Sequence, residues 1–98
     1  MTRLLEGKVA IVTGGAKGLG HGISRALAKE GASLVITGRD GAATETVAAE
    51  IERDFGTKAI GMAADSGVKA DVLAFVDKAV ESFGGLDILV NNAGIQHV

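Results

Sequence analysis

A glycine-rich turn constrains this chain more than any other feature. The stretch "VTGGAKGLGHG", residues 12–22, holds five glycines in eleven residues and overlaps the end of the apolar run Val9–Val12. Apolar residues with helical spacing follow directly. Glycines at a strand-to-helix junction let the backbone approach a phosphate closely, and the helix N-terminus offers unpaired N–H groups and partial positive charge. The turn therefore predicts a phosphate-binding loop.

Three segments of the chain repeat one plan: a short apolar run, an amphipathic stretch and a closing glycine. The closing glycines, Gly31, Gly56 and Gly84, are 25 and 28 residues apart and predict helix C-termini. The apolar runs are rich in β-branched residues and predict strands covered on both faces. These runs are Val9–Val12, Leu34–Ile36, Ala59–Ala64 and Ile88–Val90. Their order predicts an α/β fold, a parallel sheet with helices on both faces, in one domain over residues 1–98.

The predicted helices carry apolar residues three and four positions apart, which indicates their buried faces. In the third helix these residues are Val72, Phe75, Val76, Ala79, Val80 and Phe83, and in the first they are Ile23, Ala26 and Leu27. The acids on the other helix faces are predicted to lie in solvent. They include Glu45, Glu50, Asp71 and Asp77.

Composition excludes several classes of protein and site. The chain has no cysteine, which rules out disulfides, a cysteine-based zinc site and a thiol nucleophile. A net charge of −2 with interspersed signs argues against a nucleic-acid surface, which needs clustered Lys and Arg. The apolar run near the N-terminus is too short for a signal peptide or a membrane span. We expect a cytoplasmic protein with no membrane contact and no metal site.

The spacing of the glycines distinguishes between phosphate-binding motifs. A P-loop needs a Gly-Lys-Ser/Thr ending, whereas here Lys17 is followed by Gly18 and Leu19. The G-x-G-x-x-G fingerprint does not match either, since the glycines stand at 14, 18 and 20. With Thr13 in front, "TGGAKGLG" resembles the TGxxxGxG motif of short-chain dehydrogenases/reductases, and "NNAG", residues 91–94, resembles that family's second motif. The resemblance covers all 98 residues.

The resemblance implies a Rossmann-like sheet of strand order 3-2-1-4, with further strands beyond the fourth. It also implies a dinucleotide cofactor across the carboxyl ends of the strands. By motif position, Gly14, Lys17, Gly18 and Leu19 would border the pyrophosphate, Gly20 would allow close helix packing, and Asn92, Ala93 and Gly94 would line the adenosine side. Asp65 would lie beside the adenine, although Ser66 follows it where the family commonly has an apolar residue.

The end of the second predicted strand, "LVITGRD", bears on the choice between NADP and NAD. In family members that prefer NAD, an acidic residue there accepts the ribose 2′-OH, but Gly38 holds that position here. Arg39 follows, and its guanidinium can fork onto a 2′-phosphate, with Lys17 adding positive charge. We therefore expect NADP, with NAD as the alternative. Asp40 leaves two outcomes open, since it can pair with Arg39 or cap the next helix.

The residues that the resemblance implies for catalysis are missing from this sequence. The family transfers hydride between a nicotinamide and a carbonyl or alcohol, and its Tyr, Lys, Ser and Asn all follow the NNAG motif. Here only residues 95–98 follow it, and the chain contains no tyrosine. His21 is predicted to be an exposed helix residue and His97 a mobile terminal residue, not bases. No catalytic residue is assigned.

Three functions compete at this point. The favoured one is an NAD(P)-dependent oxidoreductase of which this chain is the cofactor-binding half. It would be inactive alone, and only the complete protein would take a small carbonyl or alcohol substrate and form homo-oligomers. The second is a nucleotide-binding module without chemistry. The third is a structural half-domain that pairs through Ile88–Val90, an edge left unprotected by an end at Val98. We expect the chain alone to be marginally stable or to self-associate.

Overall fold

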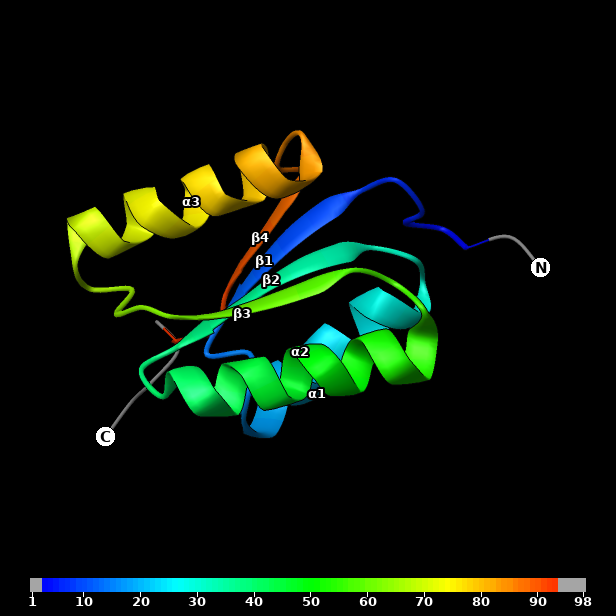
Figure 1. The fold of residues 1–98 in the computed structure, drawn as a ribbon, viewed down its shortest axis with the longest axis horizontal. Coiled ribbons are helices and arrows are strands. Elements are labelled where there is room, and N and C mark those ends of the chain that lie inside the picture. Colours follow the sequence, from blue (N-terminus) through cyan, green and yellow to red (C-terminus); the bar gives the residue numbers. More distant parts are fainter. Residues whose placement is uncertain (1–2, 94–98) are drawn as a thin grey trace.

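Four parallel strands form the sheet of this protein in a computed structural model that describes residues 3–93 (Figure 1). The strands are β1 (Val9–Thr13), β2 (Ser33–Gly38), β3 (Ala59–Ala63) and β4 (Ile88–Asn91). Their order is β3-β2-β1-β4, which confirms the predicted order 3-2-1-4. In the register, Ile11 of β1 lies between Val35 of β2 and Leu89 of β4. All of β1 is buried, so the glycine-rich turn leaves the sheet from its interior.

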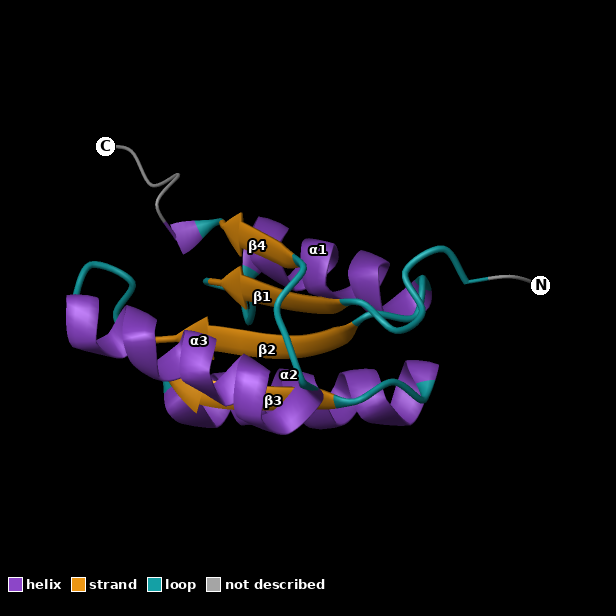
Figure 2. Ribbon diagram, turned by 90° about the horizontal axis from the view of Figure 1, so that it is seen from above, coloured by secondary structure: helices purple, strands orange, loops and turns teal. Residues whose placement is uncertain are grey.

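Three helices cover the two faces of the sheet. They are α1 (Gly18–Lys29), α2 (Gly41–Phe55) and α3 (Lys69–Phe83). Helices α1 and α2 lie on one face and α3 lies on the other (Figures 1 and 2). This confirms the predicted architecture, in which each helix connects two parallel strands. Within residues 3–93, no helix has the length and apolar character needed to cross a membrane.

Alternating side chains of the strands fill one hydrophobic cluster on each face of the sheet. The cluster toward α1 and α2 includes Leu34 and Ile51, and the cluster toward α3 includes Ile11 and Phe75. These four side chains are at most 2% exposed. Because both faces are covered, the strands appear in the sequence as nearly continuous apolar runs, and their predicted bounds lie within two residues of the observed ones.

The predicted buried face of α1 is correct only in part, since Leu27 packs against the cluster on this side of the sheet but is not fully buried. The buried residues of this helix are Gly20, Ser24 and Ala28, whereas Ala26 is exposed and Ile23 and Leu27 are half-buried. Small residues face the sheet because α1 lies close to the loop that precedes it. The Ser24 hydroxyl is within hydrogen-bond reach of the Gly15 and Gly20 carbonyls, at 3.2 and 2.9 Å. Apolar periodicity cannot find such a face, because glycine and serine are not counted as apolar.

One side of α3 also departs from the prediction. Val80 was expected on the buried face but is 49% exposed, and Leu73, seven residues earlier on the same face, is 55% exposed. Leu89 of β4 is 52% exposed as well. Among the described strands, β4 pairs with β1 alone, so it is an edge strand as predicted. The apolar side chains of α3 and β4 thus remain partly in solvent at this edge.

The helix ends agree with the three predicted glycines. Gly56 and Gly84 are the left-handed C-caps of α2 and α3. Gly31 has a positive φ and directly follows Glu30, the C-cap of α1. The chain therefore turns back toward the sheet after each helix. The next strand then starts at the edge of the sheet where the amino ends of all four described strands lie.

A cluster of charged side chains joins α1 to α2. His21 Nε2 lies 3.0 Å from the Glu50 carboxylate, and Arg25 pairs with both Glu50 and Asp54. The Arg25 guanidinium also lies 4.8 Å from the centre of the Phe55 ring, in reach of a cation–π interaction. The prediction that Glu50 lies unpaired in solvent is therefore wrong. Its partners on α1 lie 25 and 29 residues away in the sequence, beyond the reach of local spacing rules.

This cluster predicts an acid-sensitive contribution to stability. The hydrogen bonds from His21 and then Arg25 lower the pKa of the Glu50 carboxyl, and those from Arg25 and then Arg53 lower the pKa of Asp54. Carboxyls with a lowered folded-state pKa contribute their full stabilisation above their unfolded pKa, about 4, and lose it as the pH falls through the lower folded-state pKa. The double variant Glu50→Gln/Asp54→Asn should therefore melt below the parent protein at pH 7, and the difference should be smaller at pH 3.5. Thermal unfolding followed by circular dichroism measures both differences.

The control for this experiment is Glu45→Gln, a substitution of an exposed carboxylate on the same helix. It should leave the melting temperature nearly unchanged at both pH values, because surface substitutions away from specific contacts have small effects. A difference in melting temperature between the double variant and the parent that is equally large at pH 7 and pH 3.5 would show that the two carboxylates do not stabilise the fold through their charges.

Candidate functional site

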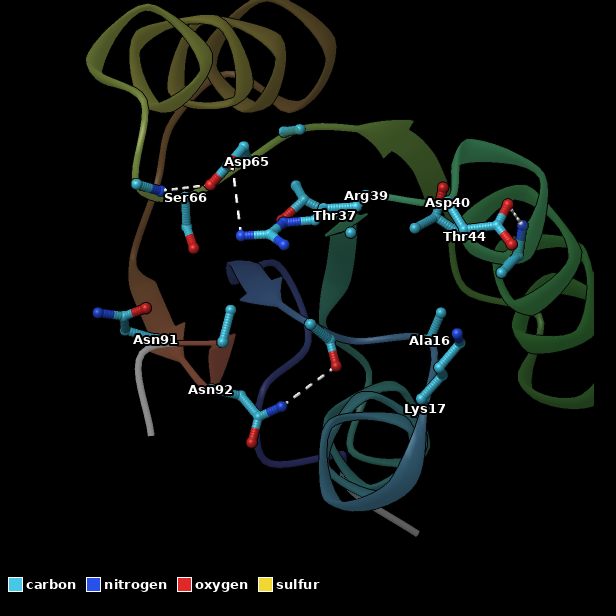
Figure 3. A pocket seen from close by; sticks show the side chains of 16 residues that line it. Ala16, Lys17, Thr37, Arg39, Asp40, Thr44, Asp65, Ser66, Asn91 and Asn92 are labelled. Carbon is cyan, nitrogen blue, oxygen red and sulfur yellow. Dashed lines mark hydrogen bonds and ion pairs between the residues drawn. The ribbon is translucent and has the colours of Figure 1, made fainter. Parts of the chain in front are cut away.

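A cavity of about 620 Å³ opens at the carboxyl ends of the strands, where the loops that follow β1, β2, β3 and β4 meet (Figure 3). Ligands of open parallel sheets bind in this position, outside the carboxyl ends of strands where the chain connections diverge. The chain connections diverge here between β1 and β4, because β2 and β3 lie on one side of β1 and β4 lies on the other. The cavity is of the size found for small-molecule sites.

The glycine-rich turn forms the wall of the cavity next to α1. Gly14 and Gly18 both have positive φ, +63° and +51°, which a residue with a side chain rarely adopts. Helix α1 begins after Lys17 with no side-chain cap and no acid in its first turn. Its first N–H groups, those of Gly18, Leu19 and Gly20, are therefore left for an anion. By contrast, Asp40 caps α2 by accepting a hydrogen bond from Ala43 N–H at 3.1 Å.

Hydrogen bonds connect the glycine-rich turn to the segment after β4. The Asn92 side-chain amide donates to the Gly14 carbonyl at 3.2 Å. The Thr13 hydroxyl accepts from Ala93 N–H at 3.1 Å and is placed to donate to Asn91 Oδ1 at 3.1 Å or to the Val90 carbonyl. The two sequence motifs thus form one structural unit, although they are separated by almost the whole chain.

Gly20 is the point of closest approach in this unit. A Cβ placed on Gly20 would overlap the Gly14 carbonyl oxygen and lie 2.7 Å from Asn92 Nδ2. Gly20 therefore allows the close helix packing expected of it. The Gly14 carbonyl of the glycine-rich turn and the Asn92 amide occupy the space that a side chain at Gly20 would need. Gly20 supports the cavity wall from behind and is not among its lining residues.

Arg39 and Asp65 face each other across the side of the cavity that β2 and β3 form (Figure 3). Arg39 Nη2 lies 3.6 Å from Asp65 Oδ2, and the two side chains are 84% and 40% exposed. The alternative left open for Asp40 is thus resolved: Asp40 caps α2, and Arg39 pairs with Asp65 instead. No carboxylate stands at Gly38, where the strand ends.

Backbone hydrogen bonds fix the position of Asp65. Its Oδ1 accepts from Gly67 N–H at 2.8 Å, and its own N–H donates to the Asp71 carboxylate at 2.8 Å. Asp71, predicted to lie free in solvent, therefore holds the loop between β3 and α3. The Asp65 carboxylate is a fixed negative charge at the cavity wall.

The predicted site residues divide into three groups. Seven of them line the cavity, and these are Gly14, Lys17, Arg39, Asp65, Ser66, Asn92 and Ala93. Gly18, Leu19 and Gly20 lie at the start of α1 next to the cavity without lining it. Gly94 lies outside the described residues, as does His97, which was predicted not to act as a base.

Sequence reasoning missed several lining residues, which are Ala16, Thr37, Ala43, Thr44, Ala64, Gly67 and Asn91. Most of them stand at the carboxyl ends of strands or in the first turn of α2. The signal that could have found them is positional: in a parallel sheet of known order, the residues that end each strand meet at one edge. Within residues 3–93, no three His, Cys, Asp or Glu side chains cluster as metal ligands would.

The geometry defines a class of protein. The cavity lies where the connections of a 3-2-1-4 parallel sheet diverge, next to an uncapped helix N-terminus that follows a glycine-rich turn. Two cationic side chains, Lys17 and Arg39, line it. These are the features of a Rossmann-type nucleotide-binding fold. The residues present fit a phosphate-bearing dinucleotide, because the start of α1 and the side chains of Lys17 and Arg39 can meet its phosphates, and Gly14 presents no side chain to the cavity.

Comparison with known proteins identifies the family. The short chain dehydrogenase family model matches residues 8–98, and the chain belongs to that family. It is 45% identical over 96 residues to a 12alpha-hydroxysteroid dehydrogenase of Clostridium sp., covering 92% of this chain and 37% of that protein. The chain spans about a third of the length of the curated relatives it matches.

Two solved structures share the fold. The L-sorbose reductase of Gluconobacter frateurii, complexed with NADPH and L-sorbose, matches with a TM-score of 0.90 and 38% identity over 99% of this chain and 37% of that one. An alcohol dehydrogenase of the archaeon Thermococcus sibiricus, complexed with 5-hydroxy-NADP, matches with a TM-score of 0.79 and 33% identity. It covers 84% of this chain and 35% of that one.

Proposed function

We propose that this chain supplies the NADP(H)-binding part of an oxidoreductase that acts on a carbonyl or alcohol. The observation that carries the proposal is the pairing, in one cavity, of an uncapped α1 N-terminus with Arg39 at a strand end that lacks a carboxylate. The first arrangement suits a pyrophosphate and the second suits a ribose 2′-phosphate. The two solved structures described above were both determined with an NADP-type cofactor, which supports the choice of NADP over NAD.

The residues of this chain would bind and orient the cofactor. When bound, NADP(H) supplies the hydride chemistry. The first N–H groups of α1, with Lys17, would hold the pyrophosphate, Arg39 would hold the 2′-phosphate, and Asp65 and Ala93 would flank the adenosine. The proton-transfer tyrosine and lysine implied by the family resemblance have no counterpart in a chain without tyrosine. We therefore propose that these 98 residues bind the cofactor without turning over substrate.

Arg39→Ala tests the cofactor assignment. The variant should bind NADPH about 10- to 100-fold more weakly than the parent, because a charge-assisted hydrogen bond contributes about 1.5–3 kcal/mol. Binding of NADH, which carries no 2′-phosphate, should change less than about threefold. Titration followed by the fluorescence of the reduced nicotinamide measures both dissociation constants.

The matched control is Arg53→Ala, which removes an exposed arginine of α2 that does not line the cavity. It should leave both dissociation constants unchanged. If Arg39→Ala leaves the ratio of NADPH to NADH affinity unchanged, NADP is rejected as the cofactor.

A second function is favoured by one specific observation, the partly exposed edge strand β4. With Leu89 52% exposed and β4 paired only with β1 among the described strands, the edge can accept a further strand. A structural half-domain that pairs there would self-associate without binding NADPH. A nucleotide-binding module without chemistry would bind NADPH and stay inactive in any longer form of the protein. Binding of NADPH in a titration would exclude the structural half-domain. Turnover of a ketone or an alcohol by a longer form of the protein would exclude the module without chemistry.

A further inference from the structure

The ion pair between Arg39 and Asp65 joins a highly exposed side chain to one that is held by a backbone hydrogen bond. The Arg39 side chain is 84% exposed, so few contacts restrict it. The Asp65 carboxylate is held by Gly67 N–H at 2.8 Å, and the loop behind it is held by Asp71. When a ligand draws the guanidinium toward itself, Asp65 therefore cannot follow.

The charges around Arg39 are unequal. Asp65 is its one ion-pair partner among residues 3–93, and the Asp40 carboxylate is engaged at the start of α2. Lys17 lines the cavity from the glycine-rich turn. A 2′-phosphate that enters between these groups would compete with a fixed carboxylate for the guanidinium and would also be repelled by that carboxylate. A ribose 2′-OH, which is neutral, would do neither.

We propose that Asp65 sets the selectivity of this site between NADP(H) and NAD(H) by competing with the 2′-phosphate for Arg39. This inference rests on the proposed function. Asp65 acts here as a positioning residue, since its effect passes through the arginine. Competition and repulsion have the same sign, so the carboxylate weakens NADP(H) binding relative to NAD(H) binding, whatever contact it makes with the adenosine that the two cofactors share. The selectivity that Arg39 provides is therefore lower than the arginine alone would give.

Asp65→Asn is the direct test. Asparagine has the same shape and its side-chain oxygen still accepts a hydrogen bond from Gly67 N–H, so the loop is preserved. The ratio of NADPH to NADH affinity should rise about two- to fivefold, in line with the small strength of exposed ion pairs, because any contact of Asp65 with the adenosine is common to both cofactors. The gain should shrink at 0.5 M salt, because screening weakens interactions between exposed charges. In an Arg39→Ala background the gain should be clearly smaller.

The control is Asp77→Asn, which removes the same charge from an exposed position of α3. It should change neither dissociation constant. The inference is overturned if Asp65→Asn leaves the ratio of NADPH to NADH affinity unchanged or lowers it, or if the ratio rises as much without Arg39. Failure of the parent protein to bind NADPH would instead reject the proposed function, and the inference with it.

Discussion

Replacing Gly20 by alanine is expected to lower NADPH binding by at least about 100-fold and to destabilise the fold by roughly 3 kcal/mol. The added Cβ would overlap the Gly14 carbonyl oxygen and lie 2.7 Å from Asn92 Nδ2. The Gly14 carbonyl belongs to the backbone, so no side-chain rotation relieves that overlap. The turn must then move away from α1, which displaces the N–H groups proposed to hold the pyrophosphate. NADPH titration and urea unfolding measure the two effects.

Gly22→Ala is the matched control, because it makes the same substitution two residues further along α1. A Cβ on Gly22 has no atom within 4 Å, and its φ is not positive. Alanine in an exposed helix interior should raise stability by up to about 1 kcal/mol and leave NADPH binding unchanged. Parent-like NADPH binding by Gly20→Ala would show that the close approach does not shape the site.

Gly61→Ala is expected to lower the melting temperature by at least about 10 °C. Gly61 lies in β3 directly beneath α2, where an added Cβ would overlap the backbone of Thr44 and lie 2.5 Å from Glu45 N. Strand and helix must separate to admit one methyl group, and such overpacking costs about 1–3 kcal/mol or more. In a domain of this size, each kcal/mol shifts the melting temperature by about 4–8 °C.

Gly85→Ala provides the comparison for this variant. Gly85 follows the C-cap of α3, and a Cβ there has no atom within 4 Å. Its melting temperature should stay close to that of the parent. If both glycine variants melt together with the parent, the tight contact between β3 and α2 does not limit stability.

The sequence was most informative where one physical cause dominates. Strands buried on both faces must be apolar throughout, so runs such as Leu34–Ile36 located the sheet. The glycine-rich turn needs particular backbone conformations at Gly14 and Gly18, so its spacing pointed to the family. Seven of the predicted site residues line one cavity because strand ends in a parallel sheet of this order meet there.

The sequence was least informative where contacts depend on packing between elements. The buried face of α1 consists of Gly20, Ser24 and Ala28, whose small size matters more than their polarity. The pairing of His21 with Glu50 requires that α1 and α2 lie side by side on one face, which no local pattern states. The choice of Asp65 over Asp40 as partner of Arg39 depends on a helix cap and on the position of a neighbouring strand.

The hydrogen bonds of Thr13 also have a consequence for the order in which the chain folds. They join residues 77–80 positions apart, whereas β1 pairs with β2 across a separation of only 24, as between Ile11 and Val35. Closing a longer loop costs more entropy, and contacts distant in sequence form slowly. The sheet can therefore begin at β1 and β2 while the chain is still being synthesised. The cavity at the strand ends is completed only after residue 93 has emerged from the ribosome, so it forms later than the pairing of β1 with β2.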